Sequence, residues 1–279
     1  LAKIDGVEIN AIADPAEAMF NRGFIDVLDL KNVDLNKLKT GQESALAGKA
    51  AVQYVRKAVD LALAKKIAAI TTAPINKKAI RLAGFKFRGH TEMLVKWTRT
   101  KDYAMMFISE PFWVILATTH RALKDVPRYL SKKKILRTIK LAHKAVLDYR
   151  KKKPKIGVAG LNPHAGESGL FGREEIKHIK PAVEEARKQG INAVGPVSPD
   201  AIFNLANARV FDIVVAMYHD QGLIPLKLLA FNKSVNVTVG LPIIRTSVDH
   251  GTGFDIVGKG WANPRSLIEA IKVAANLAR

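Results

Sequence analysis

The chain has 279 residues, of which 48% are hydrophobic and 25% are charged, a composition that supports a buried core and excludes a disordered or fibrous protein. It contains no cysteine, which excludes disulfides and thiolate ligands and leaves His and carboxylate groups for metal or acid–base chemistry. No apolar run approaches the roughly 20 residues that cross a bilayer, and no signal-peptide pattern opens the chain. We therefore predict a cytoplasmic enzyme with no membrane partner.

The charge balance is strongly basic, because 45 Lys and Arg residues against 25 Asp and Glu residues give a net charge of +20. Such a field attracts anions, among them phosphorylated metabolites and nucleic acid. The lysines form short scattered runs without the interleaved aromatic residues of nucleic-acid platforms. We interpret most of the excess as a lysine-rich surface and predict no specific nucleic-acid partner, with a basic polyanion-binding protein as the alternative from another class.

Short apolar runs alternate with amphipathic segments along the chain. The apolar runs have strand length and cover residues 67–73, 113–119, 155–161, 212–218 and 235–239. Helical patterns cover residues 43–66, 174–189, 200–209 and 264–279. We expect the helix over 174–189 to bend or restart at Pro181. A further helix is predicted after Ser131, with an apolar stripe formed by Ile135, Ile139, Ala142, Val146 and Tyr149. This alternation predicts an α/β fold with mostly parallel sheets and helices on both faces.

Three histidines share one position relative to the predicted strands. His120 ends WVILATTH, His164 ends KIGVAGLNPH and His219 ends DIVVAMYH. Functional crevices of parallel sheets lie at the carboxyl ends of the strands, so these side chains can converge there. Three neutral imidazoles bind a divalent cation such as zinc and leave positions open for a substrate. The alternative is that each histidine merely caps its strand.

Two further segments carry polar residues and glycines that suggest ligand binding rather than a purely structural role. Residues 89–92 read GHTE after a basic stretch and are suited to an anionic group. Residues 160–173 read GLNPHAGESGLFGR, and their glycines suit close approach of backbone to a phosphate. The second segment is neither a GxGxxG fingerprint nor a P-loop, because the required spacing is absent.

The segment YHDQGLIPLK places Asp220 beside His219 and Lys227 eight residues after that histidine. The apolar context of Lys227 predicts a lowered pKa and a role as general base, while the alternative is a lysine that snorkels from a strand edge. Asp220 either orients a metal-bound histidine or is a turn residue. Lys227 and Arg245 together are suited to a phosphate or a carboxylate.

Taken together, these motifs resemble the 4-hydroxythreonine-4-phosphate dehydrogenases of vitamin B6 biosynthesis. The matching segments are GHTE at 89–92, LATTHRALKDVP at 116–127, GLNPHAGESG at 160–169, AMYHDQGLIPLK at 216–227 and VNVTVGLPIIRTSVDHGTGFDIVGKGWANP at 235–264. The stretch HGTGFDIVGKGWANP also resembles the cofactor loop of isopropylmalate and isocitrate dehydrogenases. The resemblance implies two lobes around a cleft, one formed by residues 1–88 with 253–279 and the other by residues 89–252.

The resemblance also implies a reaction. NAD or NADP would oxidise 4-phosphooxy-L-threonine to 2-amino-3-oxo-4-phosphooxybutanoate, which loses carbon dioxide to give 3-amino-2-oxopropyl phosphate in pyridoxal 5'-phosphate biosynthesis. One divalent metal per site is implied, with Zn as the first choice and Co, Ni or Mg as alternatives. A homodimer with shared active sites is implied as well, with metal ligands from both subunits.

The resemblance assigns roles residue by residue. The implied metal ligands are His120, His164 and His219. The implied substrate contacts are His90, Thr91, Lys227, Asn236 and Arg245. The implied catalytic residues are Lys227 and Asp200, with a metal-bound water as an alternative base. The cofactor contacts are predicted at Gly166, Gly169, His250, Gly251, Asp255 and Asn263.

Two departures keep alternatives open. The family normally begins with a GDPxGxGPE segment, of which only a fragment resembles residues 14–16 here, so a catalytically inactive member is one alternative. The segments TGQESALAGKAA at 40–51 and TAPINKKAI at 72–80 also resemble a sister group that acts on 4-phospho-D-threonate or 4-phospho-D-erythronate. The residues assigned above do not separate these substrates.

Overall fold

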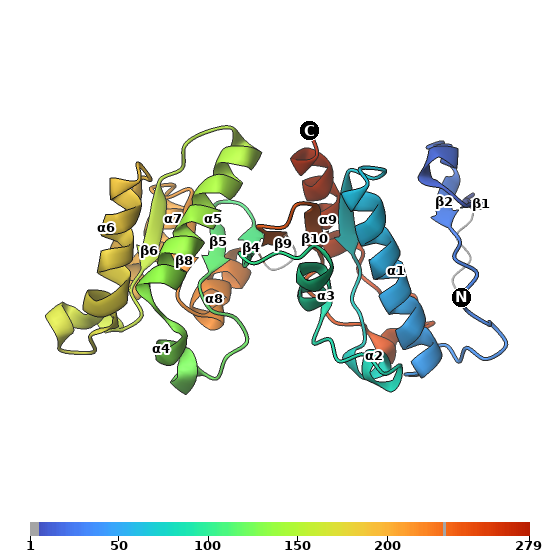
Figure 1. The fold of residues 1–279 in the computed structure, drawn as a ribbon, viewed down its shortest axis with the longest axis horizontal. Helices are drawn as coiled ribbons and strands as arrows, with labels where there is room; N and C mark the ends of the chain where they lie inside the picture. The colour runs from blue at the N-terminus through green and yellow to red at the C-terminus, as the bar shows by residue number, and fades with distance from the viewer. Residues whose placement is uncertain (1–5, 231–232) are drawn as a thin grey trace.

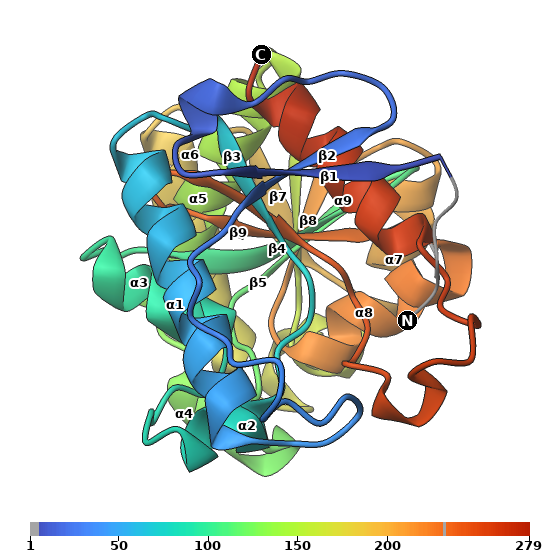
Figure 2. The same cartoon turned by 90° about the vertical axis from the view of Figure 1, so that its right-hand side faces the viewer.

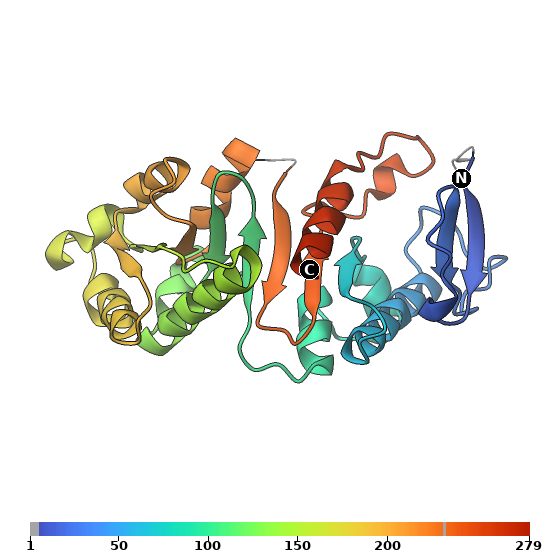
Figure 3. The same cartoon turned by 90° about the horizontal axis from the view of Figure 1, so that it is seen from above.

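The computed structural model describes residues 6–230 and 233–279, and their main feature is one eight-stranded sheet (Figure 1). Its strand order is β3-β10-β9-β4-β5-β8-β6-β7. The strands of this sheet are β3 (Ala69–Thr72), β4 (Ala104–Ile108), β5 (Trp113–Leu116), β6 (Ile156–Ala159), β7 (Ala193–Val197), β8 (Ile213–Ala216), β9 (Val235–Val239) and β10 (Ile244–Ser247). A separate parallel pair, β1 (Glu8–Ile12) and β2 (Phe24–Leu28), lies at the end of the molecule beside α1 (Figure 3).

The sheet is parallel on both sides and antiparallel at its centre. β9 runs antiparallel to both β4 and β10, and β4 runs antiparallel to β5. Four of the seven strand pairings in this sheet are parallel, so the prediction of a mostly parallel sheet is confirmed, and the three antiparallel pairings all involve β4 or β9. Short connections join the antiparallel pairs β4–β5 and β9–β10, because a few residues can join antiparallel strands whereas parallel neighbours need a long crossover. The connection after β9 begins at Gly240, where an added Cβ would lie 2.1 Å from the Asp102 carbonyl oxygen.

The helices pack on both faces of the sheet, as predicted (Figure 2). They are α1 (Ala45–Leu63), α2 (Lys77–Leu82), α3 (His90–Trp97), α4 (Val126–Tyr129), α5 (Lys132–Arg150), α6 (Lys180–Lys188), α7 (Pro199–Asn207), α8 (His219–Ala230) and α9 (Arg265–Leu277). The Ser131 Oγ atom accepts the backbone N–H of Lys134 at 3.2 Å and caps α5 where a cap was predicted. A π-helical turn, η4 (Glu175–Ile179), precedes α6 and provides the restart expected near Pro181.

Three buried clusters form the core. One lies between the sheet and α5, α6 and α9, and a second lies under α7 and α8. The third joins α1 and α3 through residues such as Val59, Met93 and Leu94. The predicted lobe boundary between residues 88 and 89 falls within this third cluster, because α3 packs on α1. The division into two lobes stays a prediction.

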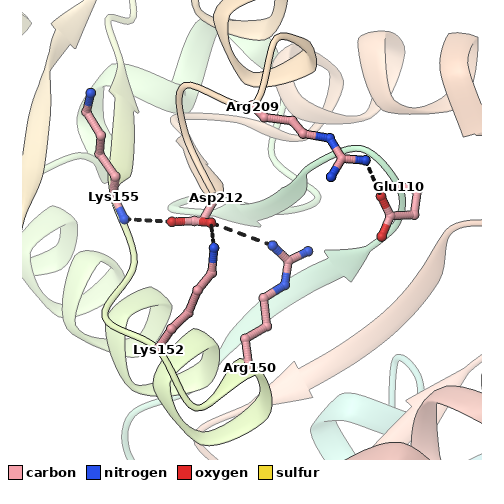
Figure 4. Close-up of polar contacts among 6 residues, drawn as sticks. All are labelled: Glu110, Arg150, Lys152, Lys155, Arg209 and Asp212. Atoms are coloured by element: carbon pink, nitrogen blue, oxygen red, sulfur yellow. Dashed lines mark hydrogen bonds and ion pairs between the residues drawn. The ribbon is translucent and has the colours of Figure 1, made fainter.

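The amino end of β8 is anchored by a charged cluster around Asp212 (Figure 4). The Asp212 carboxylate accepts the Lys155 backbone N–H at 2.9 Å and lies 2.5 Å from the Lys152 Nζ and 3.7 Å from an Arg150 guanidinium nitrogen. Burial alone would raise the pKa of Asp212, but these donors and positive charges together lower it. The cluster fixes β8 at the end opposite to His219.

Candidate active site

The three predicted metal ligands follow neighbouring parallel strands. His120 follows β5, His219 follows β8 and His164 follows β6, and these strands are adjacent in the order β5-β8-β6. The imidazole rings of His120 and His219 lie 5.7 Å apart between centroids. The strand-end pattern therefore predicts correctly that these two side chains meet.

His219 is held by the residue that follows it. An Asp220 carboxylate oxygen lies 2.7 Å from the His219 Nδ1. Because a carboxylate accepts hydrogen bonds, this contact places the ring proton on Nδ1 and leaves the Nε2 lone pair available. Of the two roles considered for Asp220, orientation of the histidine is the one that the geometry supports.

A small cavity of about 190 Å³ adjoins the two imidazoles. Its lining residues are Thr118, Thr119, His120, Arg121, Leu123, Val126, Tyr218, His219 and Asp220. The Arg121 guanidinium stacks on the Tyr129 ring at 4.1 Å and forms part of the wall. The cavity therefore combines imidazole, hydroxyl and guanidinium groups at the carboxyl ends of β5 and β8.

The electrostatic surroundings favour neutral imidazole at His120. Burial lowers the pKa of His120, and the charges of His219 and Lys77 lower it further. A neutral ring is the form that ligates a metal ion. Lys77 lies on α2, and sequence reasoning missed it as a site residue although the TAPINKKAI segment contains it.

His164 does not join the other two histidines within one chain. It is exposed, and the described part of the chain contains no group of three His, Asp or Glu residues that could hold a metal ion. The resemblance implies metal ligands from both subunits, so the role of His164 as the third ligand stays a prediction. The loop after β6 turns left-handed at His164 (φ 51°), and His164 lies close enough to Asp200 for its charge to act on that carboxylate.

Asp200, a predicted catalytic acid, lies in the first turn of α7. A hydrogen bond from the Ser198 hydroxyl is the main cause that lowers the pKa of Asp200, and the charge of His164 acts in the same direction. The carboxylate is therefore ionised at neutral pH. His164 and Asp200 form a second group, separate from the pair of His120 and His219.

The predicted substrate contact Arg245 is buried on β10, between β3 and β9. Only 3% of its surface is exposed, and its guanidinium donates to the Thr238 hydroxyl at 3.1 Å and the Thr72 hydroxyl at 2.8 Å. Its Nε atom and the Oδ1 of Asn236 are buried without a hydrogen-bond partner among residues 6–230 and 233–279. The strand register places Asn236, Thr238 and Arg245 on one face of the sheet. Unsatisfied buried polar atoms of this kind are typical of a ligand site.

His90 completes this polar face at the first residue of α3. Burial and the adjacent Arg245 charge lower the pKa of His90 to about 4, so its ring is neutral at physiological pH. The helix amino terminus, with the half-buried Thr91 beside it, adds partial positive charge. His90, Thr91 and Arg245 can therefore receive an anionic group.

Lys227 lies in surroundings different from those that the sequence suggests. Its Nζ atom pairs with Asp249 Oδ2 at 2.9 Å, and the side chain is half-buried. The expectation of an apolar environment is wrong, because Asp249 follows β10 closely and lies against α8. The ion pair joins these two elements beside the candidate site.

The predicted cofactor contacts lie in two segments. Gly166 is buried against Glu175, and Gly169 packs near Ile176. The remaining four are exposed residues of the segment between β10 and α9, namely His250, Gly251, Asp255 and Asn263. The Asn263 side chain accepts the Arg265 backbone N–H at 3.0 Å, next to α9. Cofactor binding by these residues stays a prediction.

Comparison with known proteins gives consistent matches over nearly the whole chain. A 4-hydroxythreonine-4-phosphate dehydrogenase of Desulforapulum autotrophicum is 47% identical over 96% of this chain and 79% of its own length. A D-threonate 4-phosphate dehydrogenase of Cupriavidus necator is 48% identical over 98% of this chain and 82% of its own length. The crystal structure of 4-hydroxythreonine-4-phosphate dehydrogenase from Klebsiella pneumoniae superposes with a TM-score of 0.92 at 45% identity, covering 98% of this chain and 84% of that one.

Within the described residues, no helix has the length and apolar character needed to cross a membrane.

Residues 1–274 match the family described as pyridoxal phosphate biosynthetic protein PdxA. With this match and relatives above 45% identity, the chain belongs to the PdxA family of dehydrogenases.

Proposed function

We propose that this protein is a metal-dependent, NAD(P)-linked dehydrogenase that oxidises 4-phosphooxy-L-threonine in pyridoxal 5'-phosphate biosynthesis in the cytoplasm. The product, 2-amino-3-oxo-4-phosphooxybutanoate, decarboxylates to 3-amino-2-oxopropyl phosphate. The observation that carries the proposal is the buried polar face of Arg245, His90 and Asn236, in which the Arg245 Nε and the Asn236 Oδ1 have no hydrogen-bond partner among the described residues. Relatives named for both phosphorylated acids make 4-phospho-D-threonate or 4-phospho-D-erythronate the second candidate.

Arg245 and His90 would bind the anionic end of the substrate. The guanidinium is fixed by two threonine hydroxyls, so it offers its charge in one orientation. The neutral His90 ring can donate a hydrogen bond, and the uncompensated charge of Arg245 supplies the attraction. Asn236 Oδ1 can accept a hydrogen bond from a substrate hydroxyl or amino group.

The pair of His120 and His219 fits two ligand positions of a divalent cation, with Zn as first choice. The lowered pKa of His120 favours its neutral form, and Asp220 orients the His219 ring. A bound cation supplies a Lewis acid that lowers the pKa of the substrate hydroxyl and polarises the resulting carbonyl. Lys227, paired with Asp249, and the ionised Asp200 are the candidate groups that take the hydroxyl proton.

A second copy of the chain would supply the missing third ligand. His164 is exposed in one chain and lies apart from the histidine pair, as expected of a residue offered to a partner. α8, which begins at His219, exposes large apolar side chains at Ile224 (67%), Leu228 (85%) and Leu229 (51%). An exposed apolar patch of this kind marks an interface, which supports a homodimer with shared sites.

NAD(P)H formation by the purified protein tests this proposal. The protein is loaded in turn with Zn, Co, Ni or Mg and given 4-phosphooxy-L-threonine, 4-phospho-D-threonate or 4-phospho-D-erythronate with NAD or NADP. Turnover of the amino substrate supports the first candidate, and preference for a sugar acid supports the second. Absence of turnover on all three, in a protein that folds and dimerises, would contradict both candidates and favour an inactive family member.

A further inference from the structure

Glu175 is a buried carboxylate that none of the roles above uses. It is 3% exposed and begins the π-helical turn η4, which contacts the loop after β6. Its Oε1 accepts the backbone N–H groups of Leu161 at 2.7 Å and Asn162 at 2.8 Å, and its Oε2 accepts the Asn162 side-chain amide at 2.9 Å. One carboxylate therefore fixes the beginning of the loop that carries His164.

That loop has a backbone conformation that L-residues rarely adopt. Five consecutive residues, from His164 to Ser168, have positive φ values of 51°, 53°, 83°, 42° and 56°. Left-handed backbone is disfavoured at every non-glycine residue, so such a run persists only where surrounding contacts determine it. The loop therefore needs support from outside its own residues.

Glu175 provides this support by direct packing against the left-handed turn. A Cβ added at Gly166 would lie 2.7 Å from the Glu175 Oε2, so the carboxylate occupies the space that this glycine leaves. At Gly160, an added Cβ would lie 2.9 Å from the Ala165 Cα and 3.3 Å from the Glu175 Oε1. The two glycines and the carboxylate form one tightly packed unit around residues 160–166.

We propose that Glu175 is a positioning residue that holds the His164 imidazole in the orientation needed to ligate a metal ion. The effect of Glu175 on metal binding rests on the proposed function, whereas its support of the loop around residues 160–166 does not. Partners that orient metal ligands are typically worth roughly 10- to 100-fold in metal affinity or activity.

The variants follow from the three hydrogen bonds. Glu175→Ala removes every acceptor and leaves two backbone N–H groups without their partner. Glu175→Gln keeps one carbonyl oxygen for the backbone donors but sets an NH₂ group against the Asn162 amide, so we expect partial rescue. Glu174→Gln is the matched control, because Glu174 also accepts the Asn162 side-chain amide, at 2.8 Å, whereas the Leu161 and Asn162 backbone N–H groups bond to Glu175.

The first measurement uses metal-free full chain and does not depend on the proposed function. Amide hydrogen exchange over residues 160–169 is compared among wild type, Glu175→Gln and Glu174→Gln, with α5 as internal reference. We expect exchange at least about 10-fold faster in the loop of Glu175→Gln only, as local opening becomes easier. Unchanged exchange in the loop would overturn the inference.

The second measurement is titration with Zn²⁺ or Co²⁺ alone, including the Co²⁺ absorption spectrum, with His164→Ala as reference. We expect Glu175→Ala to weaken affinity by roughly 10- to 100-fold and Glu175→Gln to lie between it and wild type. Wild-type affinity in Glu175→Ala, with affinity lost in His164→Ala, would overturn the positioning role. Equal binding by wild type and His164→Ala would instead contradict the proposed metal site. The hydrogen-exchange result alone would then show whether Glu175 holds the loop.

Discussion

The Nζ of Lys227 lies 2.9 Å from the Asp249 Oδ2, and this ion pair connects α8 to the segment that follows β10. An amino group held by this contact has one preferred position. Asp249 therefore sets the position of the Lys227 Nζ for any proton transfer in which Lys227 takes part.

We therefore expect Asp249→Asn to lower kcat by roughly 10-fold or more, within the range attributed to a positioned acid–base group. The Asn side chain keeps an acceptor but loses the charge that fixes Lys227. Steady-state kinetics across pH check this, with Glu269→Gln as control, since Glu269 pairs only at the surface with Lys272. An unchanged pH–rate profile and kcat in Asp249→Asn would remove Lys227 from the proton-transfer role.

Arg245 should resist even conservative replacement. Lys offers a single ammonium group in place of a fork that contacts Thr72 and Thr238 together, so Arg245→Lys loses at least one of these bonds. We expect KM for the phosphorylated substrate to rise by roughly 10- to 100-fold with a smaller change in kcat. Initial-rate kinetics measure both, and Arg265→Lys, at the exposed first residue of α9, serves as control. A KM within twofold of wild type would contradict the assigned anion contact.

The lowered pKa of His90 predicts a pH dependence of stability. Because the folded pKa is about 4 and the ordinary value is 6.5, the unfolded chain binds more protons between these values. The contribution of His90 is fully present above pH ~6.5 and declines as the pH falls toward 4, by at most about 3 kcal/mol. Urea unfolding at pH 7 and pH 5 should show a smaller loss in His90→Asn than in wild type. An equal loss in both proteins would place the titration elsewhere.

The cluster around Asp212 should affect stability and leave catalysis unchanged. Asp212→Ala removes the acceptor of the Lys155 backbone N–H and two cation contacts at the amino end of β8. We expect the free energy of unfolding to fall by about 1–3 kcal/mol, while kcat and KM stay as in wild type. Glu110→Gln is the control, since Glu110 pairs with Arg209 across exposed surface and should cost less than about 1 kcal/mol. Reduced kcat in folded Asp212→Ala would contradict this separation.

Periodicity alone predicts much of the scaffold. The helix capped by Ser131 appears in the structure, and each of the five predicted apolar runs contains a strand. α8 was missed because it contains Gly222 and Pro225, which ordinarily break helices. The glycine is required there, since an added Cβ would lie 2.7 Å from Val114 on β5.

The site is predicted less completely because its contacts are long-range. The strand-end rule brings His120 and His219 together, but it contains no information on the left-handed turn that moves His164 away. The two threonines that hold Arg245 lie 173 and 7 residues from it in the chain, and only strand pairing brings all three together. The sequence likewise does not indicate the partners of Asp249 and Glu175, because Lys227 and the backbone of Leu161 reach them only through tertiary packing.

The position of Arg245 has a consequence for how ligands are recognised. Its rotamer is set by hydroxyls from β3 and β9 when the sheet forms, so on the proposed function little side-chain entropy remains to be lost when an anion arrives. Recognition of the anion is therefore separate from the chemistry at the imidazoles. Phosphorylated acids that lack the reacting hydroxyl should still occupy the pocket, and they offer a route to inhibitors that need no metal contact.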